Sequence, residues 1–94
     1  MIKYRNKANR NIAEIFDYIE QQGFPQNAIN YKNRLFEFGE TLQIFPEKYQ
    51  ICRFEKYREK GYRCAPFDDY IFVYRIEGKD FIVITIVHGK RLSF

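Results

Sequence analysis

The sequence has few of the residues from which enzymes build common active sites. It contains one histidine and two cysteines, and it has no C-x-x-C pair, glycine-rich phosphate loop or serine-centred nucleophile elbow. Its adjacent carboxylates, Asp68 and Asp69, are typical of a turn and not of an acid and base pair. These absences argue against zinc enzymes, nucleoside triphosphatases and hydrolase triads, and we expect neither a metal nor a cofactor.

Long apolar runs are also missing. No window approaches the roughly 18 to 20 uncharged apolar residues of a membrane span, and "MIKYRNKANR" lacks the apolar centre of a secretion signal. We therefore expect a cytoplasmic protein without membrane contact. In that compartment Cys52 and Cys64, whose spacing fits no metal site, are predicted to be free thiols, whereas an oxidising compartment would allow a disulfide.

The sequence is rich in aromatic residues and carries a basic charge. Among its 94 residues are eight Tyr and ten Phe, enough apolar area for one small core, so we expect a single domain over residues 1–94. The net charge is +4, with cations concentrated from Lys3 to Arg10 and from Arg53 to Arg63. Such clusters attract acidic protein segments or phosphate backbones; a solvated surface is the alternative, because Glu55 and Glu59 dilute the second cluster.

The N-terminal half has the pattern of two helices. Residues 1–5 are a candidate strand, and apolar residues then follow helical spacing from Ala8 to about Gln22, with Asn6 as the expected N-cap. Gly23 ends this helix, and Pro25 suits the first turn of the next, whose apolar stripe runs to Phe45 before Pro46. So short a link predicts an antiparallel helical hairpin.

The C-terminal half has the pattern of strands. Residues 47–60 show no regular pattern, whereas "YRCAPF" is a candidate edge strand because Pro66 cannot donate to a ladder. After the turn at residues 68–69, "YIFVYRI" and "FIVITIVH" flank the hairpin turn "EGKD". The predicted fold is α+β, with an N-terminal strand and an antiparallel two-helix hairpin packed on a mostly antiparallel three- to four-stranded sheet.

Polar residues at the end of the last strand are candidates for a functional site. His88, Lys90 and Arg91 place a titratable group beside two cations, which suits either a general base with phosphate clamps or a solvated strand end. Tyr62, Tyr70 and Tyr74 could stack on bases, although aromatic residues in β-rich segments more often pack in the core. Residue patterns alone leave these alternatives open.

Three segments resemble the RelE/ParE superfamily of bacterial toxin–antitoxin systems, specifically its ParE-like, plasmid-stabilisation branch. The first is "ANRNIAEIFDYIEQQGFPQNAINYKNRL" with the later stop "FPE", and the second is "GYRCAPFDDYIFVYRIEGKDFIVITIVHG". The third is the ending "HGKR", which is similar to the family's His-Gly-x-Arg. Together they span nearly the whole chain. The resemblance implies the same fold as the residue patterns do, and it implies an antitoxin as partner.

The resemblance also implies a choice between two activities. ParE-like members interfere with DNA gyrase, whereas RelE-type members cleave mRNA on the ribosome; for the second activity the catalytic candidates are Arg63, His88 and Arg91. Ile71 occupies the strand position that resembles the one where the nuclease branch has an arginine, and no tyrosine follows Tyr74. A clamp for the scissile phosphate is therefore incomplete. We therefore favour a gyrase-binding toxin without a hydrolytic site.

On that interpretation, a surface at the sheet contacts the target or the antitoxin. A higher toxin–antitoxin assembly is left open. The residues expected at this surface are Arg63, Tyr70, Tyr74, His88, Lys90 and Arg91.

Overall fold

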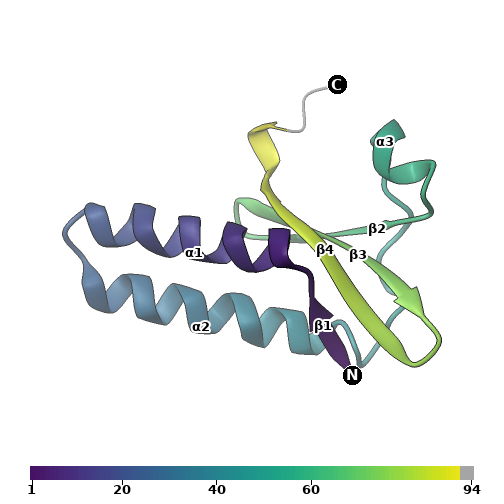
Figure 1. Cartoon of the computed structure of the whole chain (residues 1–94), viewed down its shortest axis with the longest axis horizontal. Coiled ribbons are helices and arrows are strands. Elements are labelled where there is room, and N and C mark those ends of the chain that lie inside the picture. Colours follow the sequence, from purple (N-terminus) through teal and green to yellow (C-terminus); the bar gives the residue numbers. More distant parts are fainter. Residues whose placement is uncertain (92–94) are drawn as a thin grey trace.

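The computed structural model describes residues 1–91, and for Arg91 the backbone alone. The elements follow the order of the predicted α+β fold (Figure 1). They are β1 (Ile2–Tyr4), α1 (Asn6–Gln21), α2 (Pro25–Thr41), α3 (Glu55–Arg58), β2 (Arg63–Phe67), β3 (Tyr70–Glu77), β4 (Asp80–His88) and the 3-10 helix η1 (Gly89–Arg91). Within this described part, no helix is long and apolar enough to cross a membrane.

The four strands form one mixed sheet in the order β1-β4-β3-β2. β1 is parallel to β4, and the other pairs are antiparallel, so the predicted mostly antiparallel sheet is confirmed. β2 lies at an edge of the sheet, as expected from Pro66, which has no amide hydrogen to donate to a neighbouring strand. β1 reaches only from Ile2 opposite Phe81 to Tyr4 opposite Val83, so among the described residues the later part of β4 has no strand on that side.

The predicted helical hairpin is confirmed, and it packs on one face of the sheet. α1 and α2 lie side by side (Figure 1), and the core between them and the sheet contains Leu35, Leu42 and Phe72, all fully buried. Asn11 fastens α1 to β4, because its Oδ1 accepts hydrogen bonds from Thr85 Oγ1 at 2.9 Å and from the Ile86 amide at 3.0 Å.

Residues 47–62, which we call the strap, pass from the helical face around the edge of β2 to the other face of the sheet. Strand alternation points Phe72 toward the helices and the adjacent Val73 toward the strap. Val73, Cys52 and Tyr57 form a second, smaller buried cluster. α3 is part of the strap and lies on the opposite side of the sheet from the helical hairpin (Figure 1).

The prediction of free thiols is wrong, because Cys52 and Cys64 form a disulfide with their Cα atoms 5.0 Å apart. The strap returns along the edge of β2: Ile51 pairs with Arg63 in an isolated antiparallel bridge, and the Cys52 amide donates to the Tyr62 carbonyl at 2.8 Å. This return places the two cysteines on facing chain segments. Their spacing in the sequence could not show that.

Three predicted boundaries also change. Asn6 is the first residue of α1 and not its N-cap, which is Arg5 and makes no side-chain capping bond. α2 ends at Thr41 and not near Phe45, because the amides of residues 42–44 bond to carbonyls three residues back. Phe45 is 68% exposed and does not extend the buried stripe. The four-residue helix α3 lies where no regular structure was expected.

Candidate functional site

Two of the predicted site residues meet at one end of the sheet. Tyr70 begins β3, His88 ends β4, and the two are a directly opposed cross-strand pair. Their rings are in a T-shaped arrangement with centroids 5.3 Å apart. The other side of the Tyr70 ring packs against the core beneath the helices. The sheet therefore fixes the position of the imidazole through an aromatic contact.

A tight turn after β4 brings Lys90 against the same histidine. The Lys90 amide donates to His88 Nδ1 at 3.2 Å, and the Gly89 amide donates to the Asp69 carbonyl at 2.8 Å. A neutral imidazole whose Nδ1 accepts a hydrogen bond carries its proton on Nε2. Within residues 1–91, no carboxylate forms a hydrogen bond or an ion pair with His88. In this part of the chain, His88 is therefore not oriented by a carboxylate as an activated base would be. The side chain of Arg91 lies outside the described part.

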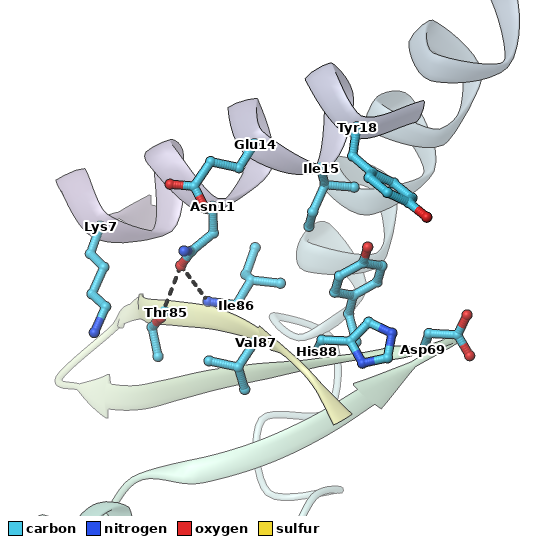
Figure 2. A pocket seen from close by; sticks show the side chains of 11 residues that line it. Lys7, Asn11, Glu14, Ile15, Tyr18, Asp69, Thr85, Ile86, Val87 and His88 are labelled. Atoms are coloured by element: carbon cyan, nitrogen blue, oxygen red, sulfur yellow. Dashed lines mark hydrogen bonds between the residues drawn. The ribbon is translucent and has the colours of Figure 1, made fainter. Parts of the chain in front are cut away.

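A cavity of about 580 Å³ opens between α1 and β4 beside this pair, and we call it the α1–β4 groove. Figure 2 shows Lys7 at one end of the groove and His88 with Asp69 at the other, with Asn11 and Glu14 above β4. Its lining therefore mixes a lysine, an imidazole, an amide and carboxylates. The full set is Lys7, Asn11, Glu14, Ile15, Tyr18, Asp69, Tyr70, Thr85, Ile86, Val87 and His88.

The residues that α1 contributes to the groove were missed from the sequence. Lys7, Asn11, Glu14 and Tyr18 recur at intervals of four, three and four, which places them on one side of a helix. The sequence analysis followed the apolar stripe of this helix and considered Lys7 only as part of the basic cluster from Lys3 to Arg10. Tracing the polar residues that border the stripe would have found them.

Arg63 lies apart from the groove. It begins β2 opposite Tyr74, four residues along β3 from Tyr70, a separation of about 13 Å at the rise of a strand. Its Nη1 donates to the Tyr49 carbonyl in the strap at 2.7 Å. Arg63 therefore fastens the strap to the edge strand. The sequence analysis placed Arg63 and His88 on one surface, and the structure separates them.

Tyr74 packs in the core. Its side chain is fully buried, and its hydroxyl donates to the Pro46 carbonyl at 2.9 Å, a bond that ties the end of the α2 region to the sheet. Burial raises the pKa of Tyr74 above its ordinary value. Of Tyr62, Tyr70 and Tyr74, which were considered for base stacking, only Tyr70 lines the groove.

The turn between β2 and β3 is held from the helical side. Asp68 has a positive φ of 55°, a conformation that aspartate tolerates better than most residues, and its carboxylate accepts a hydrogen bond from the Tyr31 hydroxyl at 2.9 Å. Burial and this hydrogen bond raise the pKa of Tyr31 above its ordinary value. The bond positions Asp69 and Tyr70 at the mouth of the groove.

Of the three catalytic candidates, Arg63 and His88 lie at separate places on the sheet, and the side chain of Arg91 is outside the described part. Arg63 and His88 are too far apart to act on one phosphate, and no group of three or more His, Cys, Asp or Glu in residues 1–91 could hold a metal ion. These features define a small basic α+β protein with an open polar groove and a strapped sheet. Such an arrangement can bind another macromolecule without a reaction of its own.

Comparison with known proteins then gives the family. The model of the ParE toxin of type II toxin–antitoxin systems, parDE, matches residues 2–93, and the chain belongs to this family. The resemblance found in the sequence is thus confirmed, and the chain is a ParE-type toxin whose partner is a cognate antitoxin.

The fold is also found among solved structures. A chain described as "Chromosomal ParDE TA system from P. aeruginosa" matches with a TM-score of 0.79 and 18% sequence identity, over 93% of this chain and 92% of that one. At this identity the likeness establishes a shared fold. No curated protein sequence is significantly similar to the chain.

Proposed function

We propose that this toxin inhibits DNA gyrase by binding it and that the cognate antitoxin blocks that binding. The observation that carries the proposal is the ParE family match over residues 2–93, since gyrase inhibition is typical of ParE toxins. Nothing in the comparisons supports the RelE-type mRNA endoribonuclease that was the alternative.

The geometry supports a binder over an enzyme. A phosphoryl-transfer site needs cations and a proton acceptor converging on one group. Here Arg63 is hydrogen-bonded to the strap, whereas His88 pairs with Tyr70 at one end of the sheet and has no carboxylate partner among residues 1–91. A toxin that acts by occupying a surface of its target needs no such convergence.

The contact surface in this proposal is the mouth of the α1–β4 groove and the turn that follows β4. Tyr70 holds the His88 ring at this mouth, and Lys90 and Arg91 supply positive charge. Arg63 adds a forked guanidinium at a second contact point on the edge of β2, suited to carboxylate or phosphate. Tyr74 is left out, because it is buried.

Expression in bacterial cells without the antitoxin tests the choice of target. Pulse labelling should show that DNA synthesis falls before protein synthesis, and co-expression of the antitoxin from the neighbouring gene should restore growth. Arg91→Ala should weaken the arrest more than His88→Gln, since a charge-assisted contact contributes more than a neutral one. If protein synthesis stops first and mRNA is cut on ribosomes, the gyrase proposal is wrong.

The antitoxin contact is tested separately by calorimetry. A protein of net charge +4 should associate with an acidic antitoxin segment more slowly and more weakly as salt rises. Titration at low and high ionic strength measures this. Absence of binding to the neighbouring gene product at both ionic strengths would contradict the proposed pairing.

A further inference from the structure

A second hollow, which shares Lys7 and Thr85 with the α1–β4 groove, opens between α3 and β4. It has a volume of about 320 Å³, and its walls come from the first turn of α1, from the strap and from the part of β4 that β1 does not pair. The lining residues are Lys7, Lys56, Tyr57, Glu59, Lys60, Tyr62, Ile84 and Thr85. We call it the lysine hollow.

The lysine hollow concentrates positive charge that the protein itself leaves uncompensated. Lys7, Lys56 and Lys60 converge on it from separate parts of the chain, against the single carboxylate of Glu59. Among residues 1–91, none of the three lysines forms an ion pair. The surrounding stretch from Arg53 to Arg63 has five cations and two carboxylates, a net charge of +3 in a chain of +4.

Two of these ammonium groups are positioned by aromatic rings. Lys56 Nζ lies 4.9 Å from the ring centroid of Tyr57, and Lys60 Nζ lies 6.0 Å from that of Tyr62. A cation over a ring is attracted to it and loses some of its rotational freedom, yet its N–H groups can still donate to an incoming anion. The disulfide and the Cys52 amide hold the ends of this segment on the sheet.

The first turn of α1 adds to the preference for an anion. No acidic residue occurs in that turn, no side chain caps it, and Lys7 adds a cation there. A positive side chain at the positive end of a helix is unfavourable, and a bound anion relieves the repulsion. This feature supports the three lysines and would not by itself indicate a site.

We propose that the lysine hollow binds the phosphate backbone of duplex DNA. Lysine is a point-charge ligand for phosphate, and a backbone offers regularly spaced phosphates to several lysines at once. Single-stranded nucleic acid is less suited, because it stacks its bases on open aromatic faces, and here lysines lie over the rings and Tyr57 is only 7% exposed. An acidic peptide is less suited, because Ile84 is the only aliphatic residue in the lining.

Fluorescence anisotropy with a labelled DNA duplex and the purified toxin tests this proposal without gyrase, so its failure is distinguishable from failure of the gyrase assignment. The test variant is Lys56→Gln with Lys60→Gln. At about 0.1 M salt it should bind roughly tenfold to a hundredfold more weakly, and the slope of log K against log salt should fall by about 2.

The matched control is Lys32→Gln with Lys48→Gln. These lysines also lie over aromatic rings, those of Phe16 and Tyr49, and their loss changes the net charge equally, but they are outside the hollow. The control variant should keep the duplex affinity of the wild type and the same slope of log K against log salt. Thermal midpoints within a few degrees of the wild type should show that both variants are folded.

Three results would overturn the proposal. One is an equal loss in the test and control variants, which would indicate a diffuse charge effect. Another is tighter binding of the corresponding single strand than of the duplex. The third is polyglutamate binding that depends on Lys56 and Lys60 while duplex binding does not, which would assign the hollow to an acidic protein segment.

Discussion

The two faces of the sheet are held in different ways. The helical face buries most of the core, including Phe72, Leu35 and Leu42, and is stabilised by apolar area. The strap face has a smaller buried cluster of Cys52, Tyr57 and Val73, and it adds a disulfide and the hydrogen bond from Arg63 to the Tyr49 carbonyl. One face is stabilised by packing along two long helices, and the other by a disulfide and a few hydrogen bonds on an irregular segment.

The largest effect is expected on the helical face. Phe72→Ala should lower the free energy of unfolding by about 3–5 kcal/mol, because it leaves a cavity beneath both helices. The neighbouring Val73→Ala, which faces the strap and is equally buried, should cost about 2 kcal/mol. Urea unfolding measures both values. Equal losses would contradict the unequal division of the core.

Removing the disulfide should produce the largest loss that originates in the strap. Cys52 and Cys64 are 12 residues apart, and closing a loop of this size stabilises the folded state by about 3 kcal/mol through the entropy of the unfolded chain. A thiol reductant should lower the urea midpoint of the wild type and leave a Cys52→Ser, Cys64→Ser variant unchanged. Alkylation of both thiols in the untreated protein would show that no disulfide is present.

The contact between helix α1 and the sheet should have an intermediate effect. Asn11→Ala leaves the Thr85 hydroxyl and the Ile86 amide without their acceptor, which should cost about 1–3 kcal/mol. Asn9→Ala, at an exposed position of the same helix, is the matched control and should change stability by less than about 0.5 kcal/mol. Thermal unfolding distinguishes the two. Similar values would mean that solvent replaces the amide in the groove.

The smallest effect is expected at Tyr4, where the helical face holds an unsatisfied polar atom. Its hydroxyl is buried near Gly39 and has no hydrogen-bond partner among the described residues, and burial together with Glu40 raises the pKa of Tyr4 to about 12. Tyr4→Phe should therefore leave stability at neutral pH unchanged or raise it by up to about 1 kcal/mol.

The pH dependence gives Tyr4→Phe a second readout. A phenol with a folded-state pKa above its unfolded value of 10.0 contributes its full stability below pH 10, and this is lost as the pH rises through about 12. Between pH 10 and about pH 12 the variant should therefore lose less stability than the wild type. Tyr31 and Tyr74 also have raised pKa values, but both proteins contain them, so the difference reports on Tyr4. Parallel pH profiles for the two proteins would contradict the assigned pKa.

The same division explains what the sequence could predict. The helices and long strands repeat with periods of 3.6 and 2, so α1, β3 and β4 were found within about two residues of their ends. The strap has a four-residue helix and no period, and the pairing of Cys52 with Cys64 depends on where the chain returns in space. No local pattern records that return.

The candidate site could be predicted only in part, because local sequence patterns do not show which segments meet in space. His88 was singled out because it ends a strand beside two cations, and Tyr70 because its ring could stack on a base; the structure places the two rings in contact. Tyr74 has the same alternation as Tyr70 but lies in the middle of β3, where burial places it in the core. The separation of Arg63 from His88 depends on the pairing register of three strands, and Lys7 joins the site only because α1 lies over β4.

The central claim is that this chain is a ParE-type toxin that blocks gyrase by binding and not by catalysis. The most direct test is a supercoiling assay with purified gyrase, relaxed plasmid and increasing amounts of the toxin without antitoxin. We predict that the plasmid stays relaxed or accumulates as cleaved DNA, and that added antitoxin restores supercoiling. The claim would be contradicted if gyrase fully supercoils the plasmid in the presence of excess toxin although the same toxin arrests growth when it is expressed in cells.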